Sequence, residues 1–310
     1  MSVVYVTKQG ARITKQSRRL VVTAKNEIVL EIPDFKIERL VIFGNADITT
    51  PALAFLLDRG IETSFLSVRG RLRGRLIGKS SKNVFLRISQ FKSFEDPIFV
   101  LNIARSVVKG KVKSMIEVAE SQRLKKRLEG IFPLIEQKKG ISALRGIEGF
   151  ASAIYFSYFA EQIPDYAFAK RQHRPAFDPV NACLNLGYTL IGNEIGSMIE
   201  ALGLDPHLGF YHQPAYGRPS LALDVLEEFR HILIDKLVVY LFRKRWLKEG
   251  MFVETENGVR LSDESFSTYL ANYEEKAAPF REIIRKQAEH LVNCIRNREV
   301  YRPYVLSGGL

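Results

Sequence analysis

The chain contains little cysteine and no long apolar segment, and each shortage argues against a class of protein. Its 310 residues include two cysteines, Cys183 and Cys294, which are far apart and form no CxxC spacing. We therefore expect two buried thiols rather than a disulfide or a zinc site. No apolar run approaches the ~20 residues of a membrane span. The first residues, MSVVYVTKQGARI, lack the pattern of a signal peptide. We expect a cytoplasmic protein without membrane association.

Acidic residues are scarce in the first third of the chain. Residues 1–92 hold 17 Lys and Arg against 7 Asp and Glu, whereas residues 93–310 hold 29 against 27. The segment Val68–Lys92 has eight basic residues and no acid. This concentration indicates a polyanion partner, and nucleic acid is favoured. The alternative is a basic surface that serves only solubility.

Arginine alternates with glycine and leucine in this basic segment. Arg69, Arg71, Arg73 and Arg75 are separated by single Gly or Leu residues. On a strand, this period of two places all four on one face, where they could follow the phosphates of DNA. We therefore predict DNA contacts for Arg71, Arg73 and Arg75. The alternative is an edge strand that charge protects from aggregation.

The hydrophobic pattern changes from strand-like to helical near residues 80–95. Short β-branched runs (VVYV, KIERLVIFG and ETSFLSV) and a hairpin that turns near Lys25–Asn26 occupy the first part. A short helix over Thr50–Arg59 is the exception. We predict the α+β class, with a β-rich domain over 1–85, a linker over 86–95 and a larger all-α domain over 96–310.

Apolar residues at three- and four-residue spacing predict the helices of the second domain. The predicted ranges are 97–113, 118–130, 132–139, 146–160, 179–202, 220–248, 262–271 and 275–298.

A loop histidine followed by an acidic helix is the strongest chemical signal. His212 lies in GFYHQPAYGRPS, and the helix that starts near Ser220 carries its apolar residues on one face. The polar residues of its other face are Asp224, Glu227, Glu228 and His231. A solvated polar face is the simplest interpretation of such a helix. The neighbouring histidine loop favours instead a site that holds a cation against a phosphate.

A further carboxylate, Glu148, lies in the apolar and glycine-rich segment LRGIEGF. An acid in such a setting is less often a plain surface residue. If Glu148 converges with His212 and the acidic helix, oxygen and nitrogen ligands together would suit Mn²⁺ or Mg²⁺. Such an ion stabilises the charge of a phosphodiester under in-line attack, by water or by a DNA 3′-hydroxyl. Spacing alone does not prove that the residues meet.

Four motifs in this order resemble the CRISPR-associated integrase family, Cas-one, which inserts new spacers into CRISPR arrays. They are RGIEGFASAIYF, RPAFDPVNACLNLGYTL, GLDPHLGFYHQ and GRPSLALDVLEEFR. The resemblance covers the whole chain, including a β-rich N-terminal domain and an α-helical C-terminal domain.

The resemblance implies a role for each motif residue. It assigns the metal ligands to Glu148, His212 and Glu227, and places Asp224 as a second acid beside the site. Some family members carry aspartate at the position of Glu227. Glu228 is then only a neighbour and, like His231, is expected on the solvated face. The resemblance also assigns Arg174 and Asn181 to support of the site or to contact with the DNA.

The implied activity is Mn²⁺- or Mg²⁺-dependent attack of a DNA 3′-hydroxyl on the CRISPR repeat, together with nuclease activity on branched DNA. The resemblance also implies homodimers through the N-terminal domain, assembled on a dimer of Cas-two. One alternative is a stand-alone nuclease that acts on branched DNA in repair. The other is a non-catalytic nucleic-acid-binding scaffold, which predicts that the three proposed ligands are dispersed.

Overall fold

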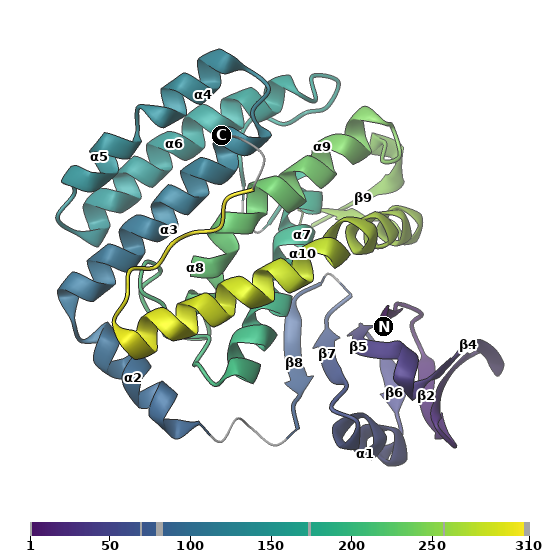
Figure 1. Ribbon diagram of the computed structural model, residues 1–310. Coiled ribbons are helices and arrows are strands. Elements are labelled where there is room, and N and C mark those ends of the chain that lie inside the picture. Colours follow the sequence, from purple (N-terminus) through teal and green to yellow (C-terminus); the bar gives the residue numbers. More distant parts are fainter. Residues whose placement is uncertain (1, 69, 79–82, 173–174, 257, 307–310) are drawn as a thin grey trace. The chain divides into compact units, whose positions relative to one another are not determined.

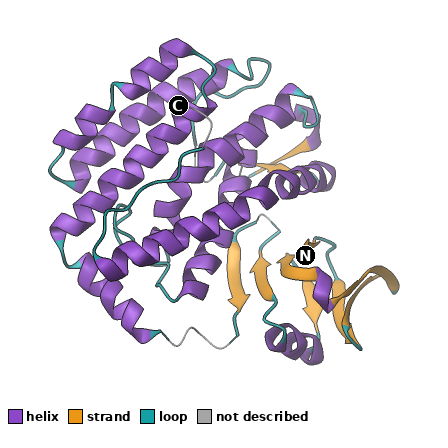
Figure 2. Cartoon of the chain, viewed as in Figure 1, coloured by secondary structure: helices purple, strands orange, loops and turns teal. Residues whose placement is uncertain are grey.

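The computed structural model describes residues 2–68, 70–78, 83–172, 175–256 and 258–306. The chain divides into two compact units, Met1–Ser80 and Ser81–Leu310. Strands predominate in the first and helices in the second (Figure 2), which confirms the α+β class. The division differs from the predicted boundary at residue 85. Most of the predicted linker, residues 86–95, belongs to helix α2 (Val84–Phe94), whose first turn is capped by the side chain of Asn83.

Two four-stranded sheets form the first unit. One has the order β1-β5-β7-β8, in which β1, β5 and β7 are parallel and β8 is antiparallel to β7. Its strands are β1 (Ser2–Val6), β5 (Ile37–Phe43), β7 (Glu62–Leu66) and β8 (Leu72–Leu76). The other has the order β4-β3-β2-β6. Its strands are β4 (Glu27–Pro33), β3 (Arg19–Ala24), β2 (Ala11–Gln16) and β6 (Ala46–Ile48).

The predicted hairpin is confirmed. Strands β3 and β4 are antiparallel neighbours, and the two residues between them, Lys25 and Asn26, have φ values of 51° and 67°. Two consecutive left-handed residues are typical of the tight turns that match the twist of a hairpin. Asparagine adopts this conformation at lower cost than most residues, which explains why the turn falls here.

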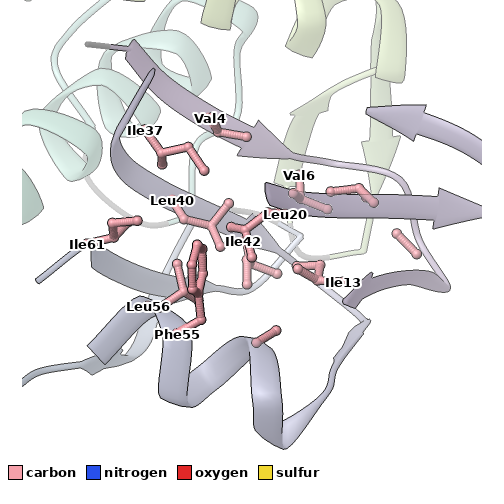
Figure 3. Close-up of a cluster of buried hydrophobic side chains, with 13 residues drawn as sticks. Val4, Val6, Ile13, Leu20, Ile37, Leu40, Ile42, Phe55, Leu56 and Ile61 are labelled. Atoms are coloured by element: carbon pink, nitrogen blue, oxygen red, sulfur yellow. The ribbon is translucent and has the colours of Figure 1, made fainter. Parts of the chain in front are cut away.

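The core of the first unit lies between the sheets and helix α1 (Thr50–Asp58). In Figure 3, Phe55 and Leu56 of this helix point toward Leu40 and Ile42 of β5. Leu40 is 0% exposed and Ile42 is 2% exposed, and the parallel strand β5 is buried at every position except Glu38.

The arginine strip is only partly a strand face. Arg69 lies outside the described residues, and Arg71 precedes β8. Within β8 the pairing with β7 joins Phe65 to Gly74 and Leu66 to Leu72, so the register skips Arg73. A bulge of this kind leaves one residue unpaired and interrupts the alternation of faces. The prediction of one regular arginine face is therefore wrong.

Helices build the second unit, and the range predicted for residues 179–202 matches its helix. The helices, with α2, are α3 (Pro97–Val118), α4 (Gln122–Glu129), α5 (Phe132–Gln137), α6 (Ile141–Glu161), α7 (Pro179–Leu202), α8 (Ser220–Phe229), α9 (Lys236–Arg243) and α10 (Asp263–Asn297). An antiparallel hairpin of β9 (Phe252–Thr255) and β10 (Gly258–Leu261) interrupts them, so the prediction of an all-α domain is wrong in this segment.

The other predicted helices differ at their ends by up to five residues, and in two places the predicted division into helices is wrong. The helix predicted for 220–248 ends as α8 and continues through a π-helical turn, Arg230–Asp235, into α9. The two helices predicted for 262–271 and 275–298 form one helix, α10, despite Pro279 inside it. Tyr273, in the predicted break, is fully buried and donates a hydrogen bond of 2.9 Å to Glu194 of α7. Packing against α7 therefore overrides the local signal for a break.

Helix α3 lies between α6 and α8 and packs against both (Figure 1). The C-terminal segment after α10 returns along α8, where Tyr304 stacks on Phe229 with ring centroids 5.3 Å apart. Helices α3 and α8 thus lie side by side, and this segment covers part of α8. Of the helices in the described ranges, none combines the length and the apolar character needed to cross a bilayer.

Candidate metal centre

Asp224 on α8 organises the histidine loop. Its carboxylate, 1% exposed, accepts hydrogen bonds from the backbone N–H groups of Phe210, Tyr211 and His212, at 2.7, 3.1 and 2.8 Å. Three consecutive N–H groups on one carboxylate satisfy donors that a buried loop would otherwise leave without partners. The position of the loop is thus determined by the helix that follows it.

Glycine at position 209 allows the loop to approach α8 closely. A β-carbon on Gly209 would lie 2.6 Å from the carbonyl carbon of Ser220 and 2.7 Å from the carbonyl oxygen of His212. Both are backbone atoms and cannot turn aside, so a side chain here would displace the loop. The Ser220 hydroxyl in turn donates to the carbonyl of Gln213 at 3.2 Å.

The two ring nitrogens of His212 face different carboxylates. Nδ1 lies 2.8 Å from Oδ1 of Asp224, and Nε2 lies 3.7 Å from Oε1 of Glu227. Asp224 accepts a hydrogen bond from Nδ1, so we assign the proton to that nitrogen and the lone pair to Nε2. A carboxylate behind a histidine in this way orients the ring and increases its basicity as a metal ligand.

Lys111 of α3 bridges the other two predicted ligands. Its ammonium forms an ion pair with Oε1 of Glu148 and lies 2.9 Å from Oε2 of Glu227. Lys111 is only 5% exposed. The hydroxyl of Ser152, one turn after Glu148 on α6, donates to the same Glu148 oxygen at 2.8 Å. Glu148, Glu227 and His212 are therefore gathered around one point. The scaffold alternative predicts that they are dispersed, so this arrangement argues against it.

Glu227 is a buried anion held by cations. Burial alone would raise its pKa, but Arg230, Lys111 and His212 lower it to about 2. Arg230 lies 3.0 Å from Oε1. Oε2 is buried and lies 2.9 Å from the Lys111 ammonium. The carboxylate is therefore ionised throughout the physiological pH range.

These donors fit a divalent cation of the Mn²⁺ or Mg²⁺ type. Two carboxylates with one imidazole are the ligands that such ions accept, and open positions remain for phosphate oxygens. Among the residues that the structure describes, no three His, Cys, Asp or Glu side chains are close enough to enclose an ion as they stand. The reason is local, because the Lys111 ammonium lies between Glu148 and Glu227.

Glu228 and His231 are not on a solvated face, and that prediction is wrong. Both are 0% exposed. Glu228 accepts hydrogen bonds from the Tyr301 hydroxyl and from the Tyr304 N–H, the latter at 2.6 Å. Nδ1 of His231 lies 2.9 Å from the Ser114 hydroxyl. Helix α8 is buried on both faces, because α3 and the C-terminal segment cover its polar side.

Two further predicted contacts have different outcomes. Arg174 lies outside the described residues. Asn181 is 0% exposed, and its side-chain oxygen accepts hydrogen bonds from Arg171 and from the N–H of Gln172, both at 2.8 Å. Its amide group donates to the carbonyl of Lys170 at 2.9 Å. Asn181 therefore supports the loop that precedes α7 and has no surface for DNA contact.

Sequence reasoning missed Lys111, although a signal was present. The residue falls on a stripe of α3 with Ala104, Val108 and Met115, all of which are 0% exposed. A lysine on an apolar stripe needs a counter-charge from a neighbouring element. The same logic applies to Arg230, which follows α8 directly and pairs with Glu227 three residues earlier.

Comparison with protein-family models matches residues 4–275 to the family described as CRISPR associated protein Cas1, which is the Cas-one family named above. The CRISPR-associated endonuclease Cas1 3 of Thermus thermophilus is 35% identical, over 99% of this chain and 98% of that protein. The CRISPR-associated endonuclease Cas1 2 of Rhodospirillum rubrum is 33% identical, over 89% of this chain and 86% of that protein.

Solved structures agree in fold. A Cas1 protein from Thermotoga maritima matches with a TM-score of 0.85 at 25% identity, covering 100% of both chains. A casposase bound to its integration product matches with a TM-score of 0.88 at 22% identity, covering 100% of this chain and 95% of that one. Since the family model spans most of the chain and relatives above 30% identity cover nearly all of it, the protein belongs to the Cas1 family of CRISPR-associated proteins.

Proposed function

We propose that this protein is a Mn²⁺- or Mg²⁺-dependent DNA integrase and endonuclease that inserts captured DNA fragments into a CRISPR array as new spacers. The observation that carries the proposal is the gathering of His212, Glu227 and Glu148 around one point. Relatives named CRISPR-associated endonucleases support the nuclease activity, and the casposase bound to an integration product has the same fold.

Each residue of the site has a defined task in this proposal. Glu148, Glu227 and Nε2 of His212 would hold the ion, and Asp224 keeps the imidazole turned toward it. When bound, the ion supplies a Lewis acid that stabilises charge on the phosphodiester and promotes loss of the proton from the attacking hydroxyl. Arg230 keeps Glu227 ionised and in place.

The reaction would be a direct transesterification. The 3′-oxygen of the fragment forms a bond to phosphorus, and the bond from phosphorus to the 3′-oxygen of the array strand breaks. The attacking hydroxyl loses its proton and the departing oxygen gains one. Tyr211 is the phenol beside the site, but burial and the nearby Glu148 and Glu227 carboxylates raise its pKa strongly. A phenol that stays protonated is a poor nucleophile, which argues against a covalent tyrosine intermediate.

The surface of α6 near Glu148 is bare, which favours the approach of a DNA backbone. A β-carbon on either Gly146 or Gly149 would meet no atom within 4 Å. Glu148 itself is partly exposed, and the neighbouring Phe150 is 54% exposed. The glycines beside Glu148 thus leave the helix surface open, while the Glu148 side chain itself is only 20% exposed. Tyr216, in the loop after His212, is also fully exposed.

Partners follow from the same proposal. Solved structures of similar fold include a Cas6-RT-Cas1–Cas2 complex and a casposase bound to its integration product. We propose that this chain acts as a homodimer, joined through its N-terminal unit, and that two dimers assemble on a Cas2 dimer. The basic residues of 1–92 would then contact DNA, Cas2 or both.

Strand transfer by site variants tests the proposal. Glu148→Gln and His212→Ala should lose strand transfer with Mn²⁺ while they still bind DNA. Glu161→Gln removes an exposed carboxylate from the same helix as Glu148 and should behave like wild type. The assay joins a labelled fragment to a CRISPR repeat with Cas2 present, and to branched DNA without Cas2. Integration by both site variants would refute the site. Wild-type activity on branched DNA alone would favour a stand-alone nuclease.

A further inference from the structure

We propose that Lys111 is a built-in cation of the metal centre, which holds Glu148 and Glu227 together in the metal-free protein and competes with the divalent ion for their oxygens. The inference rests on the proposed metal site and adds a residue that sets its affinity. Lys111 is a positioning residue, because its side chain acts through the two carboxylates.

The contacts of Lys111 carry the argument. Its ammonium pairs with Oε1 of Glu148 on α6 and lies 2.9 Å from Oε2 of Glu227 on α8, so a single cation joins two helices. Oε2 of Glu227 is buried, and Lys111 is the partner that neutralises it. Both oxygens belong to the two carboxylates that the proposed site would use to hold the ion.

Burial makes the competition strong. Lys111 is 5% exposed, and the side chain of Glu227 is 3% exposed, so water screens the pair poorly. A divalent ion that entered while the ammonium remained between the carboxylates would place like charges side by side in a poorly solvated site. Occupation by the ion and the Lys111 bridge should therefore exclude each other.

The arrangement has two consequences for the site. Without an ion, Lys111 prevents the carboxylates from repelling each other, so the ligands stay near their working positions. When the ion displaces the Lys111 ammonium, the flexible side chain would keep this second positive charge beside the ion, where phosphate oxygens of the substrate would enter. Both effects come at the cost of weaker metal binding.

Metal titration of Lys111→Met tests the inference. Methionine keeps the length of the stem and removes the charge. The control is Lys109→Met, which removes a lysine from the same helix where it pairs with Glu136, away from the site. We expect Lys111→Met to bind Mn²⁺ with a dissociation constant about tenfold lower than wild type, within the range of neighbouring-shell effects. Lys109→Met should match wild type. Electron paramagnetic resonance of free Mn²⁺ gives the constants.

Thermal unfolding supplies a second readout. Metal-free Lys111→Met should melt several degrees below wild type, because the buried Glu227 and the partly exposed Glu148 lose their shared cation. Saturating Mn²⁺ should restore most of the difference. Lys111→Gln carries the same two expectations if the methionine variant does not fold. Equal or weaker Mn²⁺ binding by the neutral variant would overturn the inference.

A third variant separates this inference from the proposed function. Glu148→Gln should lose most of the Mn²⁺ binding. If Glu148→Gln binds Mn²⁺ as wild type does, the proposed metal site itself is wrong. If Glu148→Gln loses binding while Lys111→Met matches wild type, the metal site stands and only the role of Lys111 is wrong.

Discussion

Replacement of Glu228 by glutamine should change how the stability of the protein depends on pH. Glu228 is 0% exposed, and burial raises its pKa from 4.5 to about 8, although the hydrogen bonds from Tyr301 and Tyr304 act in the opposite direction. The folded pKa thus lies above the unfolded one. The stability that this carboxyl contributes is therefore fully present below pH 4.5 and is lost as the pH rises through 8.

The magnitude follows from the shift. A rise in the Glu228 pKa from 4.5 to about 8 lowers the free energy of unfolding by about 5 kcal/mol in total as the pH rises. About 3–4 kcal/mol of this loss falls between pH 5 and pH 8. Glutamine has the same shape, carries no charge and can still accept the Tyr304 hydrogen bond. Between pH 5 and pH 8, the free energy of unfolding of Glu228→Gln should therefore fall by about 3–4 kcal/mol less than that of wild type.

Urea unfolding at pH 5, 6, 7 and 8 measures the effect. The fluorescence of Trp246, the single tryptophan of the chain, reports on the second unit, and EDTA keeps the site free of metal. Glu161→Gln, an exposed glutamate on α6, is the control and should follow wild type. Parallel pH profiles for wild type and Glu228→Gln would refute the reasoning, because they would mean that the buried carboxyl does not titrate in this window.

Three further predictions concern the site and the DNA contacts. Asp224→Asn replaces one oxygen of the carboxylate that accepts from three backbone N–H groups and from the His212 ring. Mn²⁺ affinity should therefore fall by about 10–100-fold in a metal titration. Unchanged affinity would contradict the orienting role of Asp224. Tyr211→Phe should retain strand transfer, and a covalent DNA adduct with wild type would show that the phenol is the nucleophile. Joint replacement of Arg73 and Arg75 by Gln should reduce the salt slope of DNA binding by up to about two; an unaltered slope would place these arginines away from the phosphates.

The sequence predicted most elements of the fold because their signals are local. The Lys25–Asn26 turn and the apolar periodicity of α7 are properties of short segments, and both agree with the structure. Errors occurred where distant packing decides the outcome. Helix α10 continues through the predicted break because Tyr273 is buried and bonded to Glu194 of α7. The bulge at Arg73 depends on the pairing with β7, which no pattern in β8 encodes.

The candidate site shows the same limit. Glu148, His212 and Glu227 could be named from their motifs, but their convergence required the packing of α3, α6 and α8. Periodicity assigned Glu228 to solvent, since a helix with one apolar face normally exposes the other. That inference fails because α8 is covered on both sides. Lys111 was overlooked for a related reason, as its partners lie 37 and 116 residues away in sequence.

Anomalous diffraction from a crystal soaked in MnCl₂ would locate the bound metal. We expect one manganese peak bound by Glu148, Glu227 and Nε2 of His212, each at ~2.0–2.3 Å, with the Lys111 ammonium moved away from the carboxylates. A peak elsewhere, or no peak at a concentration that supports strand transfer, would contradict the assignment of these residues as the metal centre.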